Sequence, residues 1–251
     1  MRKYLPGFLG FLTLLAVWEV VGRIMEANQR IATVPPFTKV VSSMFEDGWT
    51  YYGPNISSTV WIALRGFFWG NLIAIAMAFL VLLLPQLERP IMQLGVTSYC
   101  LPIIAIGPVL LLAYDADTTK VIITVLFVLF GTLVNLLVGL RSADPTSLDV
   151  IRAYGGGRLQ GLRKVRLMAS LPSFFAGLRV AGPAAVLGAI LGEFFGADRG
   201  LGVGIIRSQQ QLEVPRTWAI AVVGSLLGTF AYGVFALIAR FATPWAPRGG
   251  T

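Results

Sequence analysis

The sequence predicts an all-α, polytopic membrane protein with six transmembrane helices, and three observations lead to this fold class. The 251 residues are 56% hydrophobic and 13% charged, and their mean hydropathy is +0.75, whereas soluble domains carry about 25% charged residues. The apolar residues gather in segments long enough to cross a bilayer, and the stretches between these segments are short. We find no linker and no convincing internal repeat, so residues 1–251 are expected to form a single transmembrane domain.

A spanning helix needs about 20 largely apolar residues. Six segments meet this requirement, at about 5–25, 57–84, 90–113, 119–140, 171–195 and 217–241. The first of them could instead be a secretory signal peptide, since Arg2 and Lys3 precede its apolar core. Glu19 interrupts that core and no small-residue cleavage site follows, so an uncleaved first span is favoured. A short amphipathic piece around 38–45 is expected to lie on the membrane interface.

The lysines and arginines of the short loops predict the orientation. If the N-terminus is inside, the inner loops carry more of these residues than the outer loops, while Arg65 and Arg179 fall within spans. This bias has the sign of the positive-inside rule. We therefore expect both termini, and a loop over 141–170, to lie in the cytoplasm.

The composition also limits the chemistry that the chain can perform. It contains no histidine and a single cysteine, Cys100, which excludes an intrachain disulfide and a Cys/His zinc cluster and removes the most common general base. We predict no catalytic residue, no metal site and no cofactor on this chain, and a membrane-embedded enzyme has little support. The net charge of +8 is explained by membrane topology, so the bilayer rather than nucleic acid is the expected partner.

The cytoplasmic loop has the pattern of two short helices joined by glycines. Asp144 and Pro145 form a helix start signal, and Leu148, Ile151 and Tyr154 then fall on one helical face. The glycines at 155–157 end this helix, and a second helix resumes with apolar residues on one side and basic residues on the other. Leu171-Pro172 is expected to open the fifth span, because proline is accepted in a first turn.

Three interpretations of this loop compete. A phosphate-binding loop would need a preceding strand and a Lys-Ser/Thr pair after the glycines, and both are missing. A helix lying on anionic lipid headgroups is one remaining interpretation. A docking element for a cytoplasmic partner is the other, and the tight glycine joint favours docking over a plain interfacial helix.

Polar side chains within spans are costly and are candidates for a substrate pathway. The candidates are Arg65, Asn71, Ser98, Asn135 and Glu193. Arg65 either reaches the outer headgroups with its side chain or provides a positive site for an anionic solute. Asn135 and Ser98 are more often partners in interhelical hydrogen bonds than ligands.

The loop resembles the cytoplasmic EAA motif of permease subunits of binding-protein-dependent ABC importers, in which Glu-Ala-Ala precedes a glycine and then Ile-x-Leu-Pro. Asp149-Val150-Ile151 stands where Glu-Ala-Ala is expected, Gly155 matches the glycine, and Val165-x-Leu167 matches Ile-x-Leu. Further motifs, in the same order along the chain, resemble the nitrate/sulfonate/taurine branch: Val34-Pro35-Pro36, Pro102-x-x-Ala105-x-x-Pro108, Asn135 with Gly139-Leu140, and Glu193 followed by Gly200-Leu201-Gly202.

The resemblance implies the type I importer permease fold, with two copies of the chain, as a homodimer, forming the pore in the bacterial inner membrane. It also implies a pair of separate cytoplasmic ATPase subunits, which bind ATP and magnesium, and an extracytoplasmic solute-binding protein that delivers a small, anionic solute such as a sulfonate, nitrate or carboxylate. By the same resemblance the loop over 147–168 is a coupling element. The residues expected to contact the ATPase are Leu148, Asp149, Ile151, Arg152, Tyr154, Gly155 and Val165.

Departures from the family pattern leave the solute open. Asp149 shortens the reach of the usual glutamate, Met168 replaces the usual proline, and Ile62 stands where the branch usually has an arginine. A stand-alone secondary carrier is the alternative class of protein. It would need ionisable groups within the membrane, for which Glu193 is the main candidate, together with Glu19 or Asp115.

Overall fold

The computed structural model describes residues 5–28 and 33–245. Arg2 and Lys3, on which the predicted orientation partly depends, lie outside these residues, as do Arg30, Arg248 and both chain termini. Every regular element of the described part is helical, which confirms the all-α class. Five helices are long and apolar enough to cross a membrane, and a bent pair of helices raises the number of candidate spans to six.

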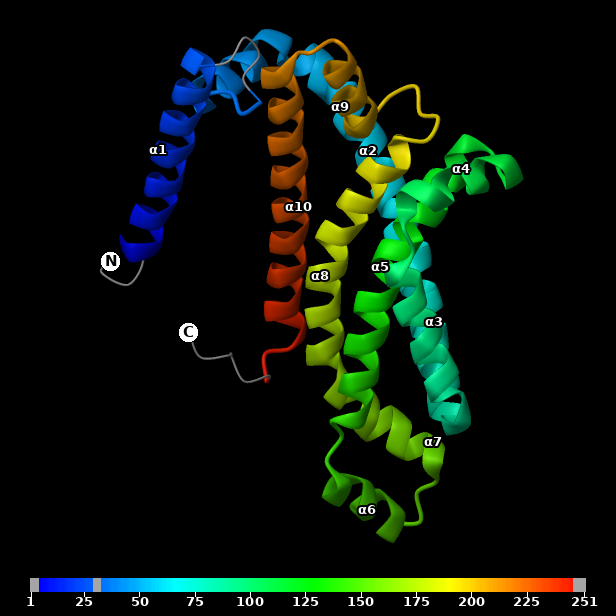
Figure 1. The fold of residues 1–251 in the computed structure, drawn as a ribbon. Coiled ribbons are helices and arrows are strands. Elements are labelled where there is room, and N and C mark those ends of the chain that lie inside the picture. The colour runs from blue at the N-terminus through cyan, green and yellow to red at the C-terminus, as the bar shows by residue number, and fades with distance from the viewer. Residues whose placement is uncertain (1–4, 29–32, 246–251) are drawn as a thin grey trace.

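The helices follow one another with short connections (Figure 1). In chain order they are α1 (Leu5–Asn28), α2 (Phe37–Leu83), a 3-10 turn (Pro85–Leu87), α3 (Glu88–Cys100), α4 (Ile103–Ala113), α5 (Ala116–Arg141), α6 (Pro145–Ala153), α7 (Arg158–Gly161), a π-helical turn (Leu162–Arg166), α8 (Leu167–Glu193), α9 (Leu201–Gln210) and α10 (Val214–Ala242).

The centre of the bundle is formed by α2, α5 and α8. Small and β-branched side chains such as Ile62, Val128 and Ala185 are buried between these three helices. Glycines let the backbones of α5 and α8 approach closely, since a Cβ atom on Gly188 would lie 2.9 Å from the Cα of Thr124, and one on Gly192 would lie 3.0 Å from the Cα of Lys120. Small residues at helix interfaces commonly have this function in membranes.

The third predicted span, 90–113, is not one straight helix. It contains α3 and α4, which meet at an angle of 100°, and α4 projects to one side of the bundle in Figure 1. Leu101 has an extended backbone with ψ of 126°, because the ring of a following proline disfavours the α conformation, and Pro102 follows it directly. Hydropathy identifies this segment as apolar, but the proline bends it.

Helix α2 joins the predicted interfacial piece to the second span. Its 47 residues are interrupted at Gly48, where φ is 60° and ψ is −173°, a conformation that glycine adopts at little cost. The backbone N–H and the hydroxyl of Thr38 at the start of α2 both donate to the carboxylate of Glu19 on α1, each at 3.0 Å. Glu19, which interrupts the first apolar segment of the sequence, therefore caps the next helix.

Helix α8 begins earlier than the sequence pattern predicts. It starts at Leu167 and continues directly from the π-helical turn, so that an unbroken helical stretch of 35 residues runs from Leu159 to Glu193. Pro172 lies inside this helix rather than in its first turn. The consequence is that the loop containing α6 and α7 is joined to the fifth span without a flexible connection.

Candidate functional site

The loop between α5 and α8 forms a compact hook at one end of the bundle (Figure 1). Asp144 caps α6, because its carboxylate accepts hydrogen bonds from the backbone N–H of Ser147 at 3.0 Å and of Thr146 at 3.2 Å. The Ser147 hydroxyl also donates to this carboxylate at 2.8 Å. These bonds, the one from the Ser147 hydroxyl first, lower the pKa of Asp144 below its ordinary value, which keeps the cap ionised at neutral pH.

A glycine turn closes the hook. Gly155 has a φ of +74°, and the N–H of Gly156 donates to the carbonyl of Ile151 at 2.8 Å, as expected where a left-handed residue ends a helix. A Cβ atom on Gly161 of α7 would lie 3.3 Å from the Leu148 side chain. The second short helix therefore packs back against the first.

The structure divides the predicted ATPase-contacting residues into two groups. Leu148 and Ile151 are half-buried within the hook, whereas Tyr154 is 89% exposed. Val150, which belongs to the EAA-like motif but is not among the predicted contacts, is also exposed. Asp149 and Arg152 form an exposed ion pair at 2.9 Å, and a pair of this kind adds little stability. Val165 lies half-buried in the π-helical turn.

The opposite end of the bundle contains a buried polar cluster around Glu193, which is 1% exposed. Its carboxylate accepts hydrogen bonds from the Thr59 hydroxyl and from the N–H of Gly202, both at 2.7 Å. Thr59 in turn accepts from the N–H of Leu201 at 3.0 Å, and Asn55 accepts from the N–H of Gly200 at 2.9 Å. Side chains from α2 and α8 thus satisfy three N–H groups at the start of α9.

The remaining substrate-pathway candidates have neighbours within the chain. Arg65 lies 3.9 Å from Asp117, at the start of α5. The side-chain amide of Asn71 donates to the carbonyl of Phe67 in the same helix at 2.7 Å, and its oxygen accepts from the Thr132 hydroxyl at 2.8 Å. Ser98 and Asn135 donate to carbonyls of their own helices, at Gly95 and Gly131. No described hydrogen bond joins any two of the five candidates, and their role in a substrate pathway stays a prediction.

Arg179 differs from Arg65 in its surroundings. It lies near the middle of α8, and no described carboxylate forms an ion pair with it. Its Nε atom is buried without a hydrogen-bond partner. The sequence places this arginine within a span but does not distinguish it from Arg65, because the absence of an ion-pair partner is a property of the folded chain.

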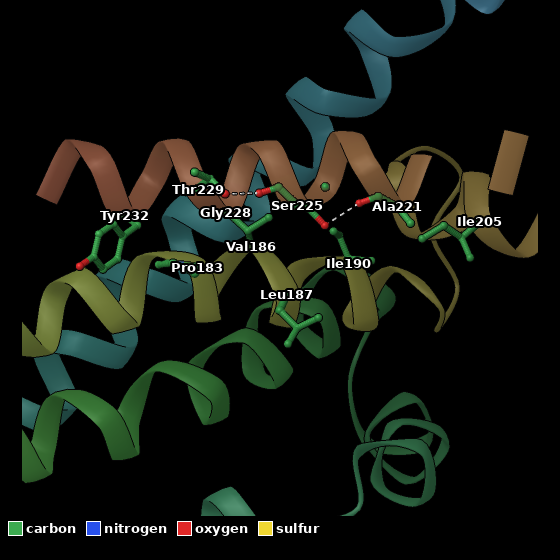
Figure 2. Close-up of a pocket in the computed structure, with 11 residues that line it drawn as sticks. Pro183, Val186, Leu187, Ile190, Ile205, Ala221, Ser225, Gly228, Thr229 and Tyr232 are labelled. Atoms are coloured by element: carbon green, nitrogen blue, oxygen red, sulfur yellow. Dashed lines mark hydrogen bonds between the residues drawn. The ribbon is translucent and has the colours of Figure 1, made fainter. Parts of the chain in front are cut away.

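A cavity of about 640 Å³ lies between α8 and α10 (Figure 2). Pro183, Val186 and Ile190 line it on α8, and Ser225, Thr229 and Tyr232 are among the residues that line it on α10. The hydroxyls of Ser225 and Thr229 donate to carbonyls one turn earlier in α10, at 2.9 Å each. The wall is mainly apolar, with a row of oxygen atoms along the α10 side.

Comparisons with known proteins agree with this architecture. The family described as "Binding-protein-dependent transport system inner membrane component" matches residues 70–243. The chain is 28% identical to the formylaminopyrimidine transport permease protein ThiX of Halalkalibacterium halodurans, over 96% of this chain and 95% of the relative. It is 23% identical to the putative aliphatic sulfonates transport permease protein SsuC of Bacillus subtilis, over 96% and 88%.

A third relative, the nitrate import permease protein NrtB of Synechococcus elongatus, is 24% identical over 80% of this chain and 75% of its own length. The family match over residues 70–243 includes most of the bundle, the hook and the end of α8. The chain therefore belongs to the family of inner-membrane components of binding-protein-dependent transport systems, the permease subunits of ABC importers.

Proposed function

We propose that this chain is the pore-forming subunit of an ATP-driven importer and that the hook over 141–170 couples it to a separate ATPase. The family match supports the importer. The coupling role is supported by the unbroken helical stretch from Leu159 to Glu193. This stretch joins the hook to the polar cluster around Glu193 at the far end of the bundle. A rigid-body shift of the hook would therefore reach both ends of α8.

The hook has the local rigidity that such coupling requires. Asp144 caps its first helix, Gly155 fixes the turn, and Leu148 packs against Gly161. Tyr154 and Val150 present an apolar surface that the chain itself does not cover. In this proposal the ATPase covers that surface, and ATP and magnesium bind to the ATPase rather than to the permease.

The wider assembly follows from the same family. We propose that the permease works as a homodimer in the bacterial inner membrane, with both termini in the cytoplasm, and receives solute from an extracytoplasmic binding protein. Support for a second copy comes from α1, which stands apart from α5 and α8 in Figure 1 and is exposed along most of its length. The first turn of α1 and the last turn of α10 point toward the end at which the hook lies, as the proposed orientation requires.

The proposed solute is a small organic or inorganic anion. Relatives named for aliphatic sulfonates and nitrate support this class. A neutral heterocycle is a second candidate, because the relative named for formylaminopyrimidine matches 96% of the chain. A binding assay of the cognate binding protein against an alkanesulfonate, nitrate and a formylaminopyrimidine distinguishes these candidates.

The experiment that tests coupling reconstitutes the permease with its ATPase and binding protein in proteoliposomes. Gly155→Val places a β-branched residue at a φ of +74°, where a residue other than glycine costs about 1–2 kcal/mol, so we expect the turn to change and ATP-driven uptake to be lost. Gly157→Val is the matched control, because a Cβ atom there meets open space and its φ is not left-handed. Uptake that continues without the ATPase would instead identify a secondary carrier.

A further inference from the structure

Arg179 lies at a depth where a charge is expensive. It is the thirteenth residue of α8, so at 1.5 Å per residue it is about 18 Å from the start of the helix and about 21 Å from Glu193. An arginine within a span is costly, and the described residues supply no carboxylate that forms an ion pair with Arg179 to offset this cost.

Arg179 lies on the same face of α8 as the cavity wall. Residues four and seven positions further along a helix share a face with the first, and here these residues are Pro183 and Val186, both of which line the cavity. Arg179 is therefore one turn beyond the cavity, on the side of the hook. Helices α8 and α10 contact each other closely at this depth, because a Cβ atom on Gly182 would lie 3.0 Å from the Phe235 ring.

Tyr232 provides a polar group at the same end of the cavity. In Figure 2 it lies beyond Pro183, at the end of the row that Ser225 and Thr229 form along α10. Its side chain is about half exposed. A guanidinium and a phenol hydroxyl are both donors suited to an oxyanion, and the cavity, about 640 Å³ in volume and largely apolar, suits an attached hydrocarbon group.

We propose that Arg179 is a solute-binding residue of the translocation pathway, which holds the sulfonate or carboxylate group of a small amphiphilic anion whose apolar part lies between α8 and α10. This inference rests on the proposed function, since it assumes that solute passes through the permease. It narrows the solute class, because a largely apolar cavity favours an organic anion over nitrate. It also assigns to Arg179 the anion-binding role that the sequence suggests for Arg65.

The test measures whether an anion protects the cavity from a thiol reagent in the complete complex. In a Cys100→Ser background, which removes the exposed native thiol, Ser225→Cys places a reactive group on the cavity wall. The probes are hexane-1-sulfonate and its neutral counterpart hexan-1-ol, added to proteoliposomes before a water-soluble maleimide. At a sulfonate concentration ten times its Kd, mass action predicts labelling that is about tenfold slower. Hexan-1-ol should protect far less.

Arg179→Gln should raise the sulfonate concentration needed for protection by about tenfold or more, since a charge-assisted hydrogen bond is lost, and Arg179→Lys should restore part of the protection. Thr229→Cys repeats the measurement if Ser225→Cys does not fold. Phe230→Cys, at a highly exposed position of α10, is the control that the sulfonate should not protect. Equal protection by both probes, or protection that depends on Arg65 and not on Arg179, would overturn the inference.

A cavity cysteine that the reagent cannot reach would also overturn it, because lipid or a second copy of the chain would then occupy this space. ATP-driven uptake measured in the same vesicles separates this inference from the proposed function. If uptake requires the ATPase while the sulfonate gives no protection, the importer assignment stands and only the role of Arg179 fails.

Discussion

Replacing Glu193 with alanine should release the start of α9 from the bundle. The carboxylate accepts two buried hydrogen bonds, from Thr59 and from the N–H of Gly202, and bonds to a charged group contribute about 1.5–3 kcal/mol each. Losing both bonds would therefore cost at most about 6 kcal/mol. The alanine variant also no longer buries a charge, and the free energy that this saves must be subtracted from the loss. We expect a net loss of about 3 kcal/mol in the free energy that holds α9 in place.

Hydrogen exchange of the purified complex measures this loss directly. The amides of residues 204–210 lie within α9, and a loss of about 3 kcal/mol should speed their exchange through local opening by about 100-fold. Glu193→Gln should have a much smaller effect, because its amide oxygen can accept from Gly202 while its NH₂ group donates to Thr59. Glu46→Ala, which removes an exposed carboxylate, is the control. Equal exchange in the alanine variant and the wild type would refute the capping role of Glu193.

Two further predictions concern the hook and the packing of the bundle. Asp144→Ala should increase proteolysis of the hook, because it removes the cap of α6. In the wild type the pKa of Asp144 is lowered, so the cap should persist at neutral pH and be lost only as the pH falls below about 4. Proteolysis of the wild-type hook that already rises at pH 6 would contradict this prediction. Gly188→Ala should lower thermal stability by about 1–3 kcal/mol, since its Cβ would lie 2.9 Å from Thr124. Gly131→Ala, where the nearest atom is 3.9 Å away, should leave stability unchanged or raise it slightly, because alanine favours a helix more than glycine does. An equal loss in both variants would contradict the packing argument.

Hydropathy and local pattern predicted much of the fold because each span is apolar over its own length. The start of the hook could also be predicted from local sequence, since Asp144 and Pro145 are adjacent and form the N-terminal cap and first residue of α6 in the structure. The bend at Leu101 was missed for a different reason. Pro102 is a visible signal, but the residues on both sides are apolar, so a hydropathy average counts them as one span.

The roles of individual polar residues could not be predicted in the same way. Glu193 meets Thr59 across 134 residues of sequence, and no periodicity within either helix predicts that meeting. Arg65 and Arg179 look alike in the sequence, as arginines within spans, yet one has Asp117 beside it and the other has no described carboxylate near it. Such differences depend on the packing of distant helices, which a single sequence does not specify locally.

Photo-crosslinking from the hook tests the central claim most directly. A photoreactive phenylalanine analogue at Tyr154, which is 89% exposed on the hook, should form an adduct with the ATPase subunit in the complete complex. The same analogue at Leu112, which is 90% exposed on α4 at the opposite end of the bundle (Figure 1), should form none. An adduct from Tyr154 alone would agree with coupling through the hook. No adduct from Tyr154, or an ATPase adduct from Leu112, would contradict it.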